Sequence, residues 1–148
     1  MADTDCGPKQ GTFCWTELMT RDAAAAGKFY TELIGWSTME MPMEGMGTYT
    51  MWVPPGSEEP VGGMMQMDGP QFENIPPHWM PYIAVDDIDA VAGNVEKLGG
   101  KLKMPVTPIP GIGRFCVLED PTGAVISLFQ TVRENSEATT GDCCCGCE

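Results

Sequence analysis

Two residues in apolar, strand-like parts of the chain have side chains suited to acid–base or metal chemistry. His78, the only histidine in the sequence, opens the stretch HWMPYIAVDDID, and Glu17 lies inside the strand-like run TFCWTELM. Imidazole and carboxylate groups bind divalent metals, and a desolvated glutamate is suited to act as a general base. His78 and Glu17 are therefore candidate ligands of an unusual metal site, and Glu17 alone is a candidate catalytic residue.

Cysteine thiols at the C-terminal end of the chain form a second candidate group. Four of the seven cysteines fall in the last six residues, CCCGCE, where Cys143, Cys145 and Cys147 are candidate ligands for zinc or Cu(I). Structural zinc sites usually contain spaced pairs such as C-x-x-C, which this segment lacks. A flexible, oxidisable tail is the alternative interpretation.

Composition and charge exclude several classes of partner. The 148 residues fit one ordinary domain, and 21 acidic against 8 basic residues give a net charge of −13. This charge repels nucleic acid and anionic lipid, so neither is an expected partner. No apolar run is long enough to cross a membrane, and the N-terminus does not resemble a secretory signal, so we expect a cytoplasmic protein.

An internal repeat predicts the architecture. The segments TELMTRDAAAAGKFYTELIGW and IAVDDIDAVAGNVEKLGGK align when Asp22 is laid on Asp87, an offset of 65 residues (87 − 22). Each segment predicts a strand followed by an amphipathic helix, with the aspartate as N-cap and glycines at the C-terminus. In the first helix, the apolar periodicity predicts that Ala26, Phe29, Tyr30 and Leu33 share a buried face.

Three strand-like runs follow each helix, which predicts an α+β fold of two βαβββ modules in tandem. We expect curved mixed sheets with the helices outside and a concave cavity inside, where a ligand would bind. The predicted segments are a tail (1–10), the first module (11–67), a linker (68–78), the second module (79–131) and a flexible Cys-rich tail (132–148).

These motifs carry a family resemblance. The paired modules, the helix RDAAAAGKFYTELIGW, VDDIDA and EDPTGAVISLF resemble the vicinal oxygen chelate superfamily, over about residues 11–131. That superfamily includes glyoxalase I, extradiol dioxygenases and bleomycin-resistance proteins. GTFCWTELMTRD, HWMPYIAVDDIDA and PGIGRFCVLEDPTGAV are similar to a bacterial glyoxalase-like subgroup labelled "putative hydroxylase".

The resemblance also implies where a metal would bind, because metal-using members carry His or Glu on the first and last strand of each module. The matching positions here are Trp15, Met80 and Ser127, with the fourth near Gly63. None of these is a usual ligand for a hard cation. We therefore expect no cofactor at the standard positions, with a divalent metal bound by other residues as the alternative.

Strand alternation indicates how Glu17 is placed. Residues 15, 17 and 19 should share the concave face, whereas Leu18 should point at the helix. The repeat places Tyr82 opposite Glu17 (17 + 65 = 82), so the two are predicted as a polar pair of candidate catalytic residues in a pocket lined by Trp15, Met80 and Ser127. The alternative is a solvated Glu17 paired with Arg114 or a lysine; Arg114 is also a candidate contact for an anionic ligand.

Three functions follow from these observations. The first is a metal-free cavity protein that binds a small apolar or aromatic molecule, as bleomycin-resistance proteins do, or acts on it through Glu17. The second is a metal-dependent lyase or dioxygenase of the glyoxalase kind, and the third is thiol or metal handling by the tail. Whether the protein is an enzyme is left open, and a homodimer is expected because open sheet edges are commonly covered.

Overall fold

The computed structural model describes residues 8–43 and 47–132. The candidate ligands Cys143, Cys145 and Cys147 lie outside the described residues. The first half contains β1 (Phe13–Thr20), α1 (Ala23–Ile34), β2 (Ser37–Met43), β3 (Gly47–Val53) and β4 (Gly62–Gln66). A 3-10 turn, η1 (Pro70–Phe72), leads to the second half: β5 (His78–Ala84), α2 (Ile88–Asn94), η2 (Glu96–Leu98), β6 (Lys101–Ile109), β7 (Gly113–Glu119) and β8 (Val125–Thr131).

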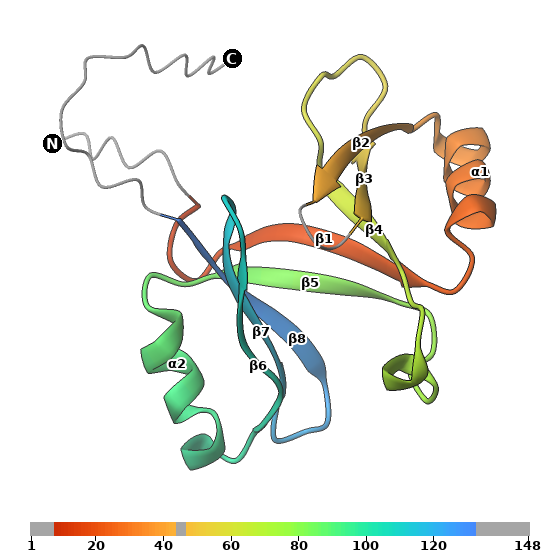
Figure 1. The fold of residues 1–148 in the computed structure, drawn as a ribbon. Helices are drawn as coiled ribbons and strands as arrows, with labels where there is room; N and C mark the ends of the chain where they lie inside the picture. Colours follow the sequence, from red (N-terminus) through yellow and green to blue (C-terminus); the bar gives the residue numbers. More distant parts are fainter. Residues whose placement is uncertain (1–7, 44–46, 133–148) are drawn as a thin grey trace, which may run out of the picture.

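All eight strands form one mixed sheet in the order β2-β3-β4-β1-β5-β8-β7-β6. The two halves meet at the antiparallel pair β1–β5, while β1 pairs in parallel with β4 and β5 with β8. Figure 1 shows β1 and β5 side by side at the centre of a curled sheet, with α1 and α2 at its two ends. The predicted α+β fold with two βαβββ units is confirmed.

The two helices begin at the predicted caps. The Asp22 carboxylate accepts a hydrogen bond from the amide of Ala25 at 3.0 Å, and Asp87 accepts from Ala90 at 3.1 Å. Gly35 ends α1 with φ of 75°, a left-handed conformation that glycine adopts without strain. Local sequence therefore specifies the start of both helices and the end of the first.

The buried face of α1 is narrower than its periodicity predicts. Ala26 and Tyr30 pack against the cluster of Leu18, Trp52 and Met64, but Phe29 and Leu33 are 55% and 62% exposed. That prediction was wrong for these two residues because β4, the strand that α1 contacts, has only five residues and covers only part of the helix surface. None of the described helices has the length and hydropathy to span a membrane.

The sheet has one face toward the helices and one concave face. Leu18 packs on the α1 side, as predicted, and Cys116 and Leu128 pack with Ile88 on the α2 side. Because side chains alternate along a strand, Glu17 and Tyr82 belong to the opposite, concave face. The polar residues of interest therefore lie on the face that the helices do not cover.

Candidate functional site

The carboxyl group of Glu17 is the buried polar centre of the concave face. Glu17 is only 5% exposed, although charged residues are rarely buried without partners. Its Oε2 accepts a hydrogen bond of 2.6 Å from the Tyr82 hydroxyl. The pair that the repeat predicts is therefore in contact, whereas the catalytic role of either residue remains a prediction.

Tyr49 is a third member of the site and was not predicted from the sequence. Its hydroxyl accepts a hydrogen bond of 3.1 Å from the indole Nε1 of Trp15 and itself hydrogen-bonds to Glu17. The Tyr49 hydroxyl occupies the space beside Gly63, where an added Cβ would lie only 1.8 Å from its oxygen. The absence of a side chain at position 63 thus makes room for a phenol that reaches Glu17 from β3.

Burial and hydrogen bonding act on the pKa of Glu17 in opposite directions. Desolvation raises the pKa of the carboxyl group, while hydrogen bonds from Tyr82 and Tyr49 and the nearby charge of His78 lower it, and the net shift is upward. Burial and the Glu17 charge also raise the pKa of both tyrosines, so both stay protonated and donate. The cluster therefore holds one carboxyl group between two permanent O–H donors.

The strand register corrects one detail of the predicted pairing. Glu17 lies directly opposite Met80, and Tyr82 lies opposite Trp15, so Glu17 and Tyr82 meet diagonally. This follows from the antiparallel β1–β5 pair, in which the repeat-related residues Thr16 and Pro81 are cross-strand partners at the centre. One residue away from that centre, repeat-related residues are diagonal neighbours. Tyr82 on β5 is in turn beside Ser127 on β8.

The residues at the four positions implied by the resemblance do not fit a hard divalent cation. Trp15 and Gly63 have no metal-binding atom, and Met80 offers a soft thioether. Ser127 has a fully buried hydroxyl that neighbours the Tyr82 hydroxyl, but a neutral hydroxyl alone does not form a site. Within the described ranges no three His, Cys, Asp or Glu residues gather around a common point.

His78 and Arg114 are placed differently from each other. The alternation of β5 puts His78 on the concave face with Met80 and Tyr82, at the start of the strand, where its Nδ1 is 2.7 Å from the carbonyl oxygen of Pro76. Arg114 lies on the helix side and donates to Asp89 at 2.7 Å, near the start of α2. The structure therefore brings His78 toward Glu17 and directs Arg114 away from it.

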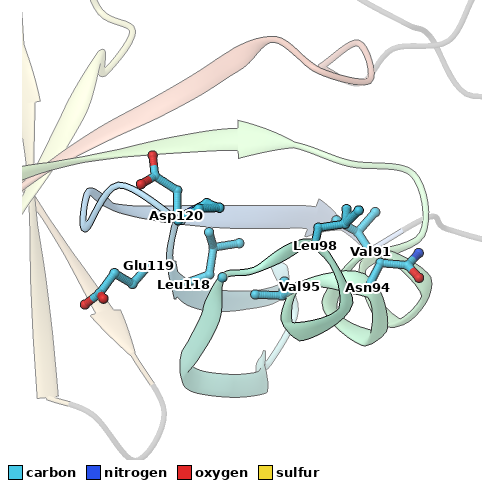
Figure 2. Close-up of a pocket in the computed structure, with 9 residues that line it drawn as sticks. Val91, Asn94, Val95, Leu98, Leu118, Glu119 and Asp120 are labelled. Carbon is cyan, nitrogen blue, oxygen red and sulfur yellow. The ribbon is translucent and has the colours of Figure 1, made fainter.

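A shallow apolar hollow lies elsewhere, between α2 and the end of β7. It measures about 310 Å³ and is lined mainly by aliphatic side chains, among them Val91, Val95, Leu98 and Leu118, with Glu119 and Asp120 beside it. Figure 2 shows these residues, which come from the helix side of the sheet. The hollow contains no member of the Glu17 cluster.

The fold and the match to a family model identify the class of protein. The model of the Glyoxalase/Bleomycin resistance protein/Dioxygenase superfamily matches residues 12–128. The chain belongs to this superfamily, as the resemblance implies. Membership fixes the architecture of paired modules, while the chemistry depends on the side chains that each member carries.

Two curated relatives match most of this chain. The chain is 43% identical over 126 residues to "Putative glyoxylase CFP32" of Mycobacterium bovis, covering 84% of this chain and 48% of that protein. It is 32% identical over 139 residues to "Anthracycline biosynthesis protein DnrV" of Streptomyces peucetius, covering 87% and 50%. The chain thus spans about half the length of these curated relatives.

Two solved structures share the fold at low sequence identity. Methylmalonyl-CoA epimerase from Mycobacterium tuberculosis superimposes with a TM-score of 0.56 at 18% identity, covering 82% of this chain and 88% of that one. The Mn(II)-bound glyoxalase from Novosphingobium aromaticivorans gives 0.53 at 19% identity, covering 82% and 39%. At these identities the likeness concerns the fold alone.

Proposed function

We propose that this protein binds a small, neutral aromatic molecule on the concave face without a metal ion, with a polar oxygen of the ligand at Glu17. The observation that carries the proposal is the 2.6 Å hydrogen bond between Tyr82 and the buried Glu17 carboxyl group. A carboxylate has about four lone-pair sites, and the two tyrosines use two of them. Glu17 can therefore accept a further hydrogen bond from a phenol or enol of a ligand.

The surroundings of Glu17 support an aromatic ligand. Trp15, Tyr49 and Tyr82 are partly exposed beside the carboxyl group, and Phe115 lies 6.4 Å from Tyr82 between ring centroids. Aromatic rings in such an arrangement favour stacked or edge-to-face contacts with another ring. The printed name of DnrV, which refers to anthracycline biosynthesis, is consistent with a polycyclic aromatic ligand.

Turnover would use the same residues. With its pKa raised by burial, Glu17 is a better proton acceptor than an exposed glutamate, since a general base works best when its pKa approaches the ambient pH. Tyr82 and Tyr49 would stabilise the ionised form of Glu17 before the proton moves to it, and again after Glu17 has passed that proton on. The expected reaction, if one occurs, is proton removal from an acidic O–H or C–H group of the ligand.

Binding of 1,8-dihydroxyanthraquinone, a neutral planar phenol, tests the proposal through quenching of tryptophan fluorescence. Glu17→Gln should weaken binding by about two- to thirtyfold, because hydrogen bonds to charged groups contribute roughly 1.5–3 kcal/mol and neutral ones about 1 kcal/mol, a difference of roughly 0.5–2 kcal/mol. Glu40→Gln is the matched control, since Glu40 is exposed on β2 and alternates to the other face. Equal affinities for the two variants would overturn the role of Glu17.

A glyoxalase-like metal enzyme is the second candidate, favoured by the name of the 43% identical relative. Its ligands would have to include Glu17 and His78, which share the concave face. Elemental analysis of the full chain purified without added metal separates the two proposals. One equivalent of nickel, zinc or iron that is lost in His78→Ala would replace the metal-free proposal with this one.

A further inference from the structure

Five methionines of β2, β3 and β4 lie on the concave face, on the same side of the sheet as the Glu17 cluster. We call Met39, Met41, Met43, Met51 and Met65 the methionine wall. Met39 pairs with Met51 across β2 and β3, Met51 pairs with Gly63 on β4, and Gly63 pairs with Glu17 on β1. The other three members alternate from these positions along the same strands, so all five side chains share the face of Glu17.

The methionine wall is not part of either packed core. Met39 is 42% exposed and the other members are partly exposed, whereas Met64, on the opposite face of β4, is 6% exposed and packs with Leu18 and Trp52. The two clusters of buried apolar residues in the described chain contain no member of the wall. These thioethers therefore remain available to contact a molecule that lies on the concave face.

Methionine is an unusual choice for so many strand positions. Strands favour β-branched and aromatic residues, whose stiff side chains give a fixed surface. Methionine is unbranched, has three rotatable side-chain bonds and a polarisable sulfur, and therefore adapts to contacts of different shape, aromatic rings included. A surface built from methionines can therefore fit aromatic ligands of several shapes, whereas stiff side chains would fit one shape best.

The register also indicates the size of the ligand. Glu17, Gly63, Met51 and Met39 form a row across β1, β4, β3 and β2. Neighbouring strands lie roughly 4.8 Å apart, so along this row Met51 is about 10 Å and Met39 about 14 Å from Glu17. Gly63 lies between Glu17 and Met51 and adds no side chain of its own. This distance suits a fused system of three or four rings with its oxygen at Glu17.

We infer that the methionine wall is the specificity-determining surface of the site and lets it accept neutral fused-ring aromatic molecules of different outline. The inference rests on the proposed function, which places the polar end of the ligand at Glu17. The net charge of −13 adds a second condition on the ligand: it should be neutral, because this charge disfavours anions.

The experiment uses the full chain labelled with ¹³C at the methionine methyl groups and three neutral probes: 1-naphthol, 1,8-dihydroxyanthraquinone and 1-hydroxypyrene. Addition of the last two should shift the methyl signals of Met39 and Met51 and leave that of Met64 unchanged. The affinities of the wild type for 1,8-dihydroxyanthraquinone and for 1-hydroxypyrene should differ by less than about tenfold. Met39→Ile and Met51→Ile should each widen that difference at least about threefold, because isoleucine is stiff at χ1.

Met104→Ile is the matched control, because Met104 is 40% exposed on β6 at the far end of the sheet. An equal effect of this change, or shifts confined to Met104 or Met64, would overturn the inference. If the probes bind through Glu17 and the wall signals do not move, the inference fails and the proposed function stands. If the wall responds and Glu17→Gln has no effect, the proposed function fails instead, and absence of binding by all three probes contradicts both.

Discussion

Gly63→Ala should break the hydrogen-bond chain that supports Glu17. A Cβ at position 63 would lie 1.8 Å from the Tyr49 hydroxyl oxygen, 2.4 Å from Cζ and 2.8 Å from Cε1. Because ordinary contacts are longer than about 3.4 Å, the whole end of the ring must move by more than 1 Å. The Trp15–Tyr49 hydrogen bond of 3.1 Å cannot survive such a displacement.

Overpacking of this kind costs typically 1–3 kcal/mol, and the lost hydrogen bond adds about 1 kcal/mol. We therefore expect Gly63→Ala to lower the free energy of unfolding by about 2–4 kcal/mol, measured by urea denaturation with tryptophan fluorescence. Ligand affinity should fall as well, because Glu17 loses a donor that orients it.

Two comparisons make the test specific. Gly93→Ala, in α2, meets nothing within 4 Å and should stabilise the protein by up to about 1 kcal/mol through helix propensity. In a Tyr49→Ala background the clash is absent, so adding Gly63→Ala should cost less than about 0.5 kcal/mol. If Gly63→Ala lowers the free energy of unfolding by the same amount in the wild type and in the Tyr49→Ala background, the explanation that Gly63 leaves space for Tyr49 is refuted.

Further predictions concern pH, the surface ion pair, a helix cap and assembly. Burial raises the pKa of Glu17 above its ordinary value of 4.5, so the folded state binds the proton more tightly than the unfolded state does. The folded state therefore loses stability as the pH rises through the raised pKa. Denaturation midpoints from pH 4 to 9 measure this loss, which Glu17→Gln should lack. Arg114→Met should change the free energy of unfolding by less than about 1 kcal/mol, because its partner Asp89 is exposed. It should leave probe affinity unaltered, because Arg114 lies on the helix side of the sheet. A tenfold loss of affinity would show that Arg114 contacts the ligand. Asp22→Ala should cost about 1 kcal/mol in urea denaturation by removing the cap on Ala25, and a neutral effect would show that the cap is dispensable. We also propose a homodimer, because β2 and β6 form the two ends of the sheet; sedimentation at a single monomer mass would contradict it.

The sequence alone was sufficient for the features that depend on local rules and on the repeat. Asp22 and Asp87 were predictable as caps because capping needs only a short polar side chain before an amphipathic segment. The contact between Glu17 and Tyr82 was predictable because a repeat offset and strand alternation together place two residues near one symmetry centre. Both arguments need no knowledge of distant packing.

Tyr49 and the exposed face of α1 could not be predicted in the same way. The approach of Tyr49 to Glu17 depends on the register of β3 with β4 and on the space left by Gly63, which are properties of the assembled sheet. The alternation of TYTMWV and the glycine pair in VGGMMQM were the only signals available. Phe29 and Leu33 satisfy a helical periodicity, but the area of sheet beneath the helix decides which apolar residues are covered.

The most direct test of the central claim is a crystal structure of the full chain with 1,8-dihydroxyanthraquinone. We predict that the rings lie on the concave face along the row from Glu17 toward Met51, with a phenolic oxygen within hydrogen-bond distance of the Glu17 carboxyl group. A ligand bound instead in the hollow beside α2, against Val91 and Leu98, would contradict the proposed site.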